Sequence, residues 1–309
     1  MNTLHFKYAI EVERTRSITQ AAENLFMGQP NLSKAIKELE DTLGFVIFQR
    51  TSKGVAPTAK GSEFLVYARN ILAQLEKMES LSDAGSAQTQ QLSVSIPRSS
   101  YISDAVTRFA ASLDREKAIQ VNIQETSAVQ TVAHITDGQF DVGVIRFNKE
   151  HETYFLDYLA DKQLEYELLW DFEKLILFSA HHPLVQIPLL HAEDFSAYVQ
   201  VTHSDHAVPY LTPAVARKEP GRSLRCVQAQ ERCSQFDLLA EIEGAYMWTA
   251  PVPDSWLDRF GLIQRACLGA PQCRDMIVYP KGHKFTVYER QFIDLLFEAK
   301  NDVALRDYT

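Results

Sequence analysis

The sequence predicts an α/β protein with an N-terminal all-α winged helix-turn-helix, a long linker helix and a larger domain of alternating strands and helices. Three observations carry this prediction. Two short amphipathic helices near the N-terminus flank a tight turn that contains glycine. A long helical stretch follows with apolar residues at heptad spacing, and the remaining two thirds alternate strand-like and helix-like segments.

Length and composition favour a globular protein of two or three domains, since 46% of the 309 residues are hydrophobic and 23% are charged. No apolar run approaches the roughly 18 residues of a membrane span, and the first residues lack the apolar stretch of a secretory signal. We therefore expect a cytoplasmic protein without a membrane partner. The formal net charge is -9, yet residues 1–80 carry ten Lys/Arg against nine Asp/Glu. A polyanionic partner would therefore meet the first segment only.

The first two helices are predicted from apolar stripes. Phe6, Ala9 and Val12 form the stripe of the first helix, which ends at the TRS stretch. The sequence SITQ has the Ser-x-x-Gln form of a capping box, so a second helix begins after Ser17. The stripe of this second helix consists of Ile18, Ala21, Ala22 and Leu25.

A third helix is predicted from Gln29 to about Leu43, with Pro30 in its first turn and Gly44 as its stop. In a helix-turn-helix this helix enters the DNA major groove with its N-terminal residues. Its polar and basic face can reach base edges or phosphates, and we predict that it contacts double-stranded DNA through Gln29, Pro30, Asn31, Ser33, Lys34 and Lys37. The alternative is a surface hairpin whose polar side is merely solvated.

The run FVIFQRTSKGVAPTAKG predicts a two-stranded wing. Arg50 and Lys53 lie near its tip, where they would grip the adjacent DNA backbone or minor groove. Thr58 is placed to cap the helix that follows.

That helix carries an apolar seam with the spacing of a coiled coil, formed by Phe64, Ala68, Ile71, Leu75 and Met78. We expect the seam to pair with a second copy of the chain, which would give a homodimer. The alternative is that the stripe packs on the chain's own globular part.

The run SITQAAENL…QPNLSKAIKELEDTLGFVIFQR…APTAKG resembles the winged helix-turn-helix signature of LysR-type transcriptional regulators. One departure is Gly28, which stands where the family usually has serine, so a hydroxyl contact to phosphate would be lost there. The resemblance implies a non-enzymatic transcriptional regulator without a cofactor, controlled by a small-molecule inducer. It also implies assembly of homodimers into a homotetramer, and RNA polymerase as a partner if the protein is an activator.

After a polar linker, the strands LSVSIP, IQVNIQE and DVGVI alternate with helices, and a second α/β set follows. This layout is similar to the family's effector-binding domain, with two Rossmann-like lobes of periplasmic-binding-protein type. The expected domains are residues 1–58 for DNA binding, 59–91 for the linker helix and hinge, and 92–309 for the effector. Within the last, lobe one would comprise 92–166 and 268–309, and lobe two 167–267.

In the family the inducer lies between the lobes, near the carboxyl ends of strands. By resemblance, the effector-binding candidates are Ser99, Ser100, Thr126, Ser127, Thr202 and His203, although Ala128 stands where members often carry a hydroxyl. Arg146, directly after the predicted third strand, could pair with a carboxylate bidentately, or could form a surface salt bridge instead. The expected ligand is a small polar metabolite, either neutral or anionic.

Other functional classes find little support in the sequence. It has no HExxH, GxSxG, P-loop or GxGxxG motif. The HSDH cluster with His203, Asp205 and His206, and His181 and His182 upstream, does not have the spacing of a metal site, so we expect no metal. A free solute-binding protein would explain the last two thirds but not the wing. A redox role of the four cysteines, Cys226, Cys233, Cys267 and Cys273, is left open by their spacing.

Overall fold

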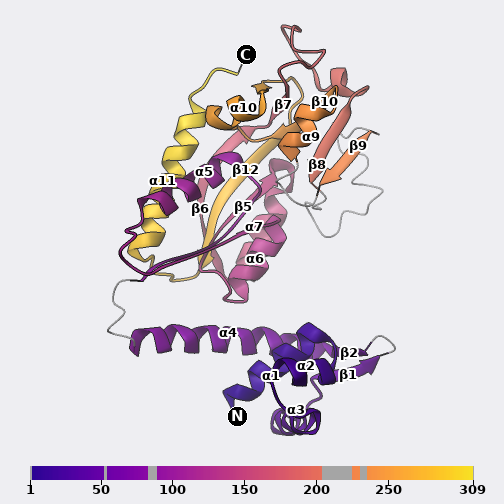
Figure 1. Cartoon of the computed structure of the whole chain (residues 1–309), viewed down its shortest axis with the longest axis vertical. Helices are drawn as coiled ribbons and strands as arrows, with labels where there is room; N and C mark the ends of the chain where they lie inside the picture. The colour runs from indigo at the N-terminus through magenta and orange to yellow at the C-terminus, as the bar shows by residue number, and fades with distance from the viewer. Residues whose placement is uncertain (1, 52–53, 83–88, 204–224, 230–234, 309) are drawn as a thin grey trace. The chain divides into compact units, whose positions relative to one another are not determined.

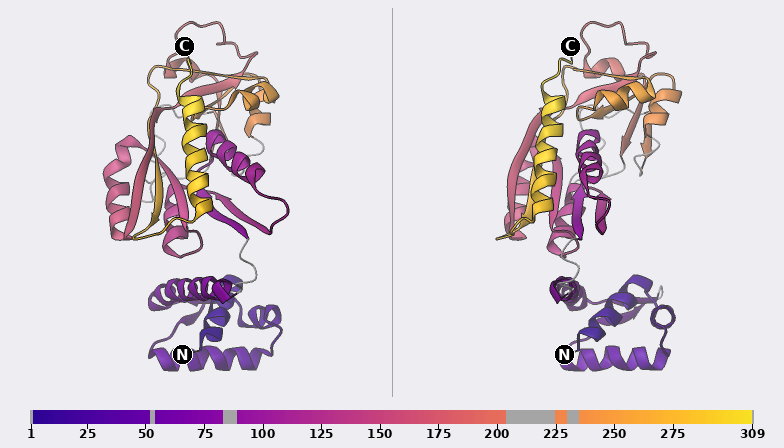
Figure 2. Two further views of the ribbon diagram at one scale, coloured as in Figure 1. Left: turned by 90° about the vertical axis from the view of Figure 1, so that its left-hand side faces the viewer. Right: turned by 60° about the vertical axis from the view of Figure 1, so that its left-hand side comes forward.

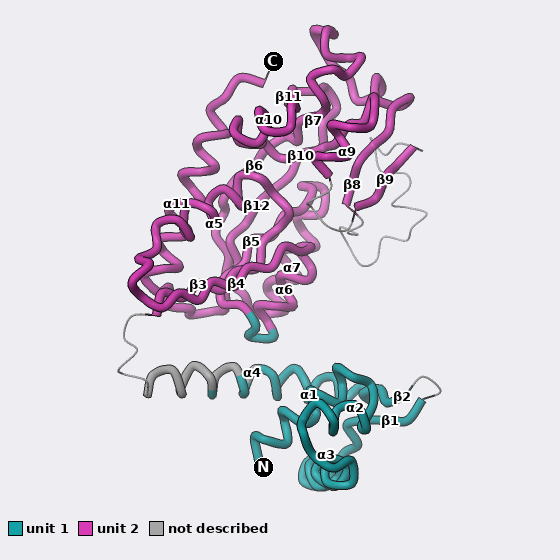
Figure 3. The backbone as a smooth tube through the Cα atoms, viewed as in Figure 1, with its two compact units in different colours: residues 1–87, 137–139 teal, residues 88–136, 140–309 magenta. Residues whose placement is uncertain are grey.

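The computed structural model of the chain describes residues 2–51, 54–82, 89–203, 225–229 and 235–308. It divides into two compact units (Figures 1 and 3). Unit 1 consists of residues 1–87 and 137–139, and unit 2 of residues 88–136 and 140–309. Each unit has a hydrophobic core of its own. Within the described residues, no helix is both long and apolar enough to cross a membrane.

Unit 1 contains the helices α1 (Thr3–Thr15), α2 (Ile18–Asn24), α3 (Gln29–Leu43) and α4 (Ala59–Ser82), and the strands β1 (Phe48–Thr51) and β2 (Gly54–Pro57). The apolar stripes predicted from the sequence meet in its core, which includes Phe6, Ala9, Val12, Ala21, Ala22, Leu32, Ile36 and Leu39. The bounds of α3 agree with the prediction, with Pro30 in its first turn and Gly44 at its end. Gly44 has φ of 75°, the left-handed conformation that glycine adopts readily at a helix C-terminus.

The predicted capping box of α2 is only half formed. The Ser17 hydroxyl accepts the Gln20 N–H at 3.3 Å, as expected. The Gln20 side chain, however, donates to Glu23 and Asn24 rather than reaching back to the helix start. A single Ser cap therefore begins this short helix, because two other acceptors compete for the Gln20 amide.

The wing is a two-stranded antiparallel sheet in which Phe48 faces Pro57 and Arg50 faces Val55. The Glu40 carboxylate accepts the N–H groups of Ile47 and Phe48 at 2.7 and 3.1 Å, which fixes the wing to α3. The Thr58 hydroxyl caps α4, as predicted, by accepting the Gly61 N–H at 2.9 Å.

The residues of the apolar seam predicted on α4 are divided between the core of unit 1 and the exposed surface of the helix. Ala68 is fully buried in the core of unit 1, and the ring of Phe64 packs against those of Phe6 and Phe45. These two seam positions are thus used inside the unit, which is the alternative that the heptad spacing left open. Ile71 is 42% exposed and Leu75 is partly buried, while the side chain of Met78 lies outside the described part.

Lobe one of unit 2 is a sheet with the strand order β4-β3-β5-β12-β6. Its strands are β3 (Gln90–Ile96), β4 (Ile119–Glu125), β5 (Val142–Asn148), β6 (Leu164–Glu173) and β12 (Gln272–Pro280). Its helices are α5 (Ser100–Ser112), α6 (Ala128–Thr136), α7 (Glu152–Asp161) and α11 (Val287–Ala304), with a 3-10 turn at Lys149–His151. As predicted, β3 is parallel to both β4 and β5.

The sheet of lobe one is covered on both faces. Helices α5 and α11 pack against each other over one face (Figure 2), with the rings of Phe109 and Phe292 in edge contact. Helices α6 and α7 cover the other face, where Val132, Phe155 and Leu159 are buried. The returning strand β12 lies between β5 and β6 and is antiparallel to both.

Lobe two has the strand order β11-β7-β10-β8-β9. Its strands are β7 (Leu175–Ser179), β8 (Val199–His203), β9 (Cys226–Ala229), β10 (Ala245–Thr249) and β11 (Leu262–Arg265). Helices α9 (Gln235–Glu241) and α10 (Asp254–Phe260) and a 3-10 turn at Ala192–Phe195 accompany them. The strands β10, β8 and β9 are parallel, whereas β7 runs antiparallel to its two neighbours.

Two boundaries differ from the sequence prediction. Lobe two was expected to begin at residue 167, but β6 stays paired with β12 in the sheet of lobe one as far as Glu173. The sequence LEYELLWDFE of β6 lacks the regular alternation of apolar and polar residues by which a strand is recognised. Its glutamates are tolerated because β6 is an edge strand with exposed side chains. Likewise β5 continues to Asn148, so Arg146 lies inside the strand and not after it.

Candidate nucleic-acid interface and effector site

The start of α3 presents the predicted polar face to solvent. Gly28 is the N-cap without a side-chain contribution, and Gln29, Pro30, Asn31, Lys34 and Lys37 are exposed, with Ser33 partly so. Leu32, Ala35, Ile36 and Leu39 are buried on the opposite side. Pro30 has no N–H, and the Asn31 N–H donates to the Gly28 carbonyl at 3.0 Å, so the exposed side chains of this face, more than its backbone, are available to DNA.

The basic side chains of this face are weakly engaged. The Lys34 ammonium lies 3.7 Å from the Glu38 carboxylate, and the Lys34 side chain is 78% exposed. Such a pair contributes little and leaves the ammonium available to another anion. Glu40, by contrast, is occupied by the backbone of the wing and takes no part in the exposed face.

Of the two DNA-binding residues predicted in the wing, the structure describes Arg50. Arg50 is exposed on β1, one residue from the end of the strand. Lys53 lies outside the described residues. The arginine thus extends the basic surface beyond α3, on an element that Glu40 fixes to that helix.

In unit 2, Arg146 is held in a buried cluster that sequence reasoning did not foresee. Its guanidinium donates to both Asp275 oxygens at 2.7 and 2.6 Å and to the Ser99 hydroxyl at 3.1 Å. The Tyr101 hydroxyl donates to the same carboxylate, and Asp275 is fully buried. Burial alone would lower the pKa of Arg146, but the adjacent Asp275 carboxylate raises it above its ordinary value.

Arg146 is consequently neither an open anion-binding side chain nor part of a surface salt bridge, the two roles that the sequence suggested. Its side chain is 14% exposed, and the rings of Tyr101 and Phe172 lie beside its guanidinium. A signal for the cluster was present, because Asp275 stands within an apolar strand and a buried carboxylate requires a cationic partner. The sequence did not reveal which cation that would be.

Four of the hydroxyl candidates gather at the carboxyl ends of β3 and β4. Ser99 stands at the N-cap position of α5 without a capping hydrogen bond from its side chain and, like Ser100, is at least 95% buried. Thr126 follows β4 and donates its N–H to the Ile96 carbonyl at 2.8 Å, while the Ser127 hydroxyl accepts the Gln130 N–H at the start of α6. These residues follow strands β3 and β4, which are parallel, and so lie at one edge of the sheet, while their role in effector binding stays a prediction.

The remaining two effector candidates end β8 in lobe two. The Thr202 hydroxyl donates to the His203 carbonyl at 3.4 Å. The Nδ1 atom of His203 lies 2.7 Å from the Gln235 amide nitrogen, and Gln235 is 1% exposed. Gln235 was not predicted, since only the fold brings the start of α9 to the end of β8.

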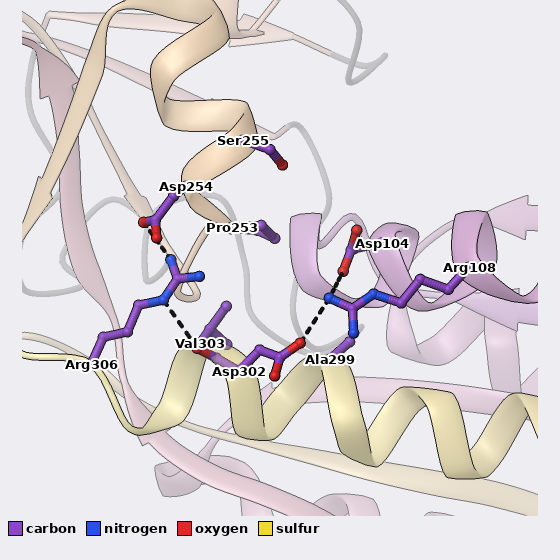
Figure 4. Close-up of a pocket in the computed structure, with 9 residues that line it drawn as sticks. All are labelled: Asp104, Arg108, Pro253, Asp254, Ser255, Ala299, Asp302, Val303 and Arg306. Carbon is purple, nitrogen blue, oxygen red and sulfur yellow. Dashed lines mark hydrogen bonds and ion pairs between the residues drawn. The ribbon is translucent and has the colours of Figure 1, made fainter.

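A cavity of about 370 Å³ lies elsewhere in unit 2, among α5, α10 and α11 (Figure 4). Arg108 bridges Asp104 and Asp302 at 2.7 Å, and Arg306 pairs with Asp254 at 2.6 Å. The other residues that line it are Pro253, Ser255, Ala299 and Val303. Its charges are thus paired with one another, and no predicted effector residue is among the lining residues that the structure describes.

The histidine cluster gives no metal site in the described part of the chain, where no group of three potential ligands is found. His182 is buried among the rings of Phe178, Phe195 and Tyr198, and burial lowers its pKa. Asp205 and His206 lie outside the described residues.

Two of the described cysteines, Cys267 and Cys273, have raised pKa values and are therefore expected to be unreactive. Burial, followed by the Asp194 carboxylate, raises the pKa of Cys267 to about 11. Burial also raises the pKa of Cys273, whose thiol donates to the Asn148 side chain. A raised pKa suppresses the reactive thiolate, which speaks against redox sensing by this pair. Cys226 is partly buried, and Cys233 lies outside the described residues.

Comparison with known families gives two matches. The family model described as "Bacterial regulatory helix-turn-helix protein, lysR family" matches residues 4–62. The model described as "LysR substrate binding domain" matches residues 85–301, which is more than half of the chain. The first match covers α1 to the start of α4, and the second covers nearly all of unit 2.

Curated proteins with similar sequences are transcriptional regulators. The nitrogen assimilation regulatory protein nac of Klebsiella aerogenes is 29% identical over 147 residues, 47% of this chain and 48% of that protein. AlsR of Bacillus subtilis is 25% identical over 216 residues, 68% of this chain and 67% of that protein. For nac and a probable cat1 operon activator of Acinetobacter lwoffii, the match spans about half of the relative's length.

Solved structures of similar fold cover nearly the whole chain. CbnR, a LysR family transcriptional regulator, aligns with a TM-score of 0.61 at 18% identity over 97% of this chain and 99% of that chain. CbnR in complex with its target DNA gives 0.59 at 18% identity, covering 97% and 100%. A full-length OxyR variant from Pseudomonas aeruginosa gives 0.57 at 17% identity, covering 97% and 94%. At these identities the likeness establishes the fold.

Proposed function

The chain belongs to the LysR family of bacterial regulatory helix-turn-helix proteins, and from this membership we propose that it is a sequence-specific, DNA-binding transcriptional regulator. Unit 1 would bind promoter DNA, and unit 2 would bind a small-molecule inducer between its two lobes. The observation that carries the proposal is the exposed polar and basic face at the start of α3, seated by a buried apolar stripe.

In the proposed complex the N-terminal turns of α3 lie in the major groove. Gln29 has an amide that can read a base edge with two hydrogen bonds, whereas Lys34 is a flexible cation suited to a phosphate. The wing with Arg50 would contact the adjacent backbone. The acidic balance of the rest of the chain supports DNA binding by this face alone.

We expect the protein to dimerise through the exposed side of α4. Tyr67 is 59% and Ile71 is 42% exposed, and they lie one turn apart on the same face. Tyr67 and Ile71 replace Phe64 and Ala68 as candidates for the dimer interface, because Phe64 and Ala68 pack in the core of unit 1. Leu75 and Met78 stay candidates further along the helix. Joining of two such dimers into a tetramer is implied by the family alone.

The inducer site is proposed at the edge of lobe one that carries Ser99, Ser100, Thr126 and Ser127, together with Thr202 and His203 of lobe two. These side chains offer hydroxyl and imidazole groups and suit a small polar ligand. Arg146 is left out of the proposed site, because its guanidinium is already paired with Asp275. A thermal-shift screen of metabolites against the whole chain tests this site, since a ligand at 100 times its Kd stabilises by about 2.7 kcal/mol.

The experiment that tests the central proposal is selection of bound duplexes from a random pool, followed by footprinting on DNA that flanks the protein's own gene. We expect a selected motif and a protected region at moderate salt. Equal affinity for selected and scrambled duplexes would contradict sequence-specific binding. The same preparation, studied by analytical ultracentrifugation, reports whether dimers form.

A further inference from the structure

Arg16 has an unusual backbone conformation at the junction of α1 and α2. It ends α1 with φ of 52° and ψ of 23°, in the left-handed region that glycine or asparagine adopts far more readily. A long side chain in this conformation is strained and persists only where the surroundings fix it. Residues with such backbone strain concentrate at functional sites.

The backbone of this junction is held from several sides. The Arg16 N–H donates to the Val12 carbonyl at 2.9 Å, and the Arg16 carbonyl accepts the Val55 N–H at 2.9 Å. The Thr15 hydroxyl donates to the Ser17 carbonyl at 2.9 Å and accepts the Ser17 N–H at 3.4 Å. These bonds explain how the conformation is maintained, but none of them involves the Arg16 side chain.

The same bonds place Arg16 beside the wing. Val55 faces Arg50 across the two strands of the wing and offers its N–H to Arg16 on its other side. A Cβ atom at Gly54 would come within 2.5 Å of the Arg16 carbonyl oxygen, so the approach of wing and junction depends on glycine at position 54. Arg16 and Arg50 are therefore neighbours across β2, each adjoining Val55.

The Arg16 side chain is exposed and, within the part of the chain that the structure describes, forms no ion pair. The nearby arginines differ in this respect. Arg14 pairs with Glu11, and Arg69 pairs with Glu13 at 2.6 Å. Carboxylates thus pair with these two cations, while the Arg16 side chain is exposed at the junction whose backbone contacts the wing.

We propose that Arg16 is a phosphate-binding residue that secures the DNA backbone between the helix-turn-helix and the wing. The inference rests on the proposed function, because it requires DNA on the face of α3. In helix-turn-helix proteins the helix before the recognition helix crosses the DNA backbone, and Arg16 immediately precedes Ser17, the N-cap of that helix. A cation fixed between this helix and the wing contributes affinity without reading sequence.

The test compares Arg16→Asn with a matched control, Arg14→Gln. Both remove one positive charge from the same turn, but asparagine also relieves the left-handed backbone. Affinity is measured against salt concentration for a duplex selected by the wild type and for a scrambled duplex. We expect Arg16→Asn to lower the magnitude of the log–log salt slope by about one and to weaken both duplexes about fivefold at 0.15 M salt.

The other variants separate a DNA contact from a structural role. Arg14→Gln should keep the wild-type slope, Arg16→Lys should restore most of it, and the Tm of Arg16→Asn should be no lower than that of the wild type. An unchanged slope in Arg16→Asn, or an equal loss in Arg14→Gln, overturns the inference while the proposed function stands. If the wild type selects no duplex at all, the proposed function fails, and the role of Arg16 fails with it.

Discussion

The Arg146–Asp275 pair concentrates charge in the interior of unit 2. Two short hydrogen bonds join the guanidinium to a fully buried carboxylate, and Ser99 and Tyr101 complete the set. A pair of this kind is costly to bury, yet removing one partner costs more, since it leaves the other charge without compensation. The pair also anchors Ser99 at the edge where we propose the inducer binds.

Arg146→Met should therefore destabilise unit 2 by about 3 to 5 kcal/mol in urea denaturation, because Asp275 would be left buried and unpaired. The double variant Arg146→Met with Asp275→Leu should recover part of the loss, since an apolar pair needs no charge compensation, although the buried Tyr101 hydroxyl then loses its acceptor. A loss below about 1 kcal/mol for the single variant would mean that water reaches Asp275.

The ion pairs of Asp171 on β6 are expected to contribute to the free energy of unfolding in a way that depends on pH in the acid range. Hydrogen bonds from Arg274, supported by Lys149, lower its pKa to about 2. Because the folded-state pKa lies below the unfolded value of about 3.9, the contribution is complete above pH 4 and is lost as the pH falls towards 2. The side chain is 34% exposed, so screening by solvent keeps the effect under about 1 kcal/mol.

Asp171→Asn should flatten the dependence of unfolding free energy on pH between 4 and 2, as measured by denaturation at a series of pH values. Asp161→Asn at the end of α7 is the control, because Asp161 is exposed and forms no ion pair within the described residues. An equal flattening in both variants would show that general acid effects outweigh the Arg274 contact.

Among the elements, the wing depends on one glycine. Gly54 has φ of 112°, and an added Cβ would collide with the Arg16 carbonyl. Gly54→Ala should cost about 1 to 3 kcal/mol and lower the Tm of unit 1, because the Val55–Arg16 bond must break. Gly28→Ser is the contrasting change, because an added Cβ would meet only ordinary contacts, with Asn31 at 3.7 Å and Pro30 at 3.8 Å, and helix capping should contribute a few tenths of a kcal/mol. Similar Tm values for both variants would contradict this view of the wing.

The elements differ in how far the sequence predicts them. Helix α3 could be placed because Pro30 and Gly44 mark its ends and its stripe is regular. The partner of α4 could not, since heptad spacing does not tell whether Phe64 and Ala68 meet another chain or the helix α1. Strand β6 was missed for a different reason, because its edge position allows glutamates that obscure the alternation.

The candidate sites show a similar division. The exposed residues of α3 follow from helical periodicity, and the hydroxyl groups after β3 and β4 follow from the rule that parallel strands end at one edge. Asp275 and Gln235 could not be paired with Arg146 and His203 in advance, because each pair joins elements that are distant in sequence. Contacts of this kind depend on tertiary packing.

At the scale of the whole molecule, the exposed side of α4 predicts self-association. Ile71→Glu would place a carboxylate in the proposed dimer interface, and sedimentation should then show a shift from dimer towards monomer at micromolar concentration. Asp114→Glu, on an exposed position of unit 2, is a control that should leave the dimer intact. A dimer that persists in Ile71→Glu would assign dimerisation to another surface.

The central claim is that the start of α3 reads DNA, with different tasks for Gln29 and Lys34. The most direct measurement is the affinity of the wild type, Gln29→Ala and Lys34→Ala for the selected duplex and its single-base-pair variants over a range of salt concentrations. We predict that Gln29→Ala loses about 1 to 3 kcal/mol of discrimination at one base pair. Lys34→Ala should lower the salt slope by about one while its sequence preference stays the same. Wild-type discrimination in Gln29→Ala, together with an unchanged slope in Lys34→Ala, would contradict the account.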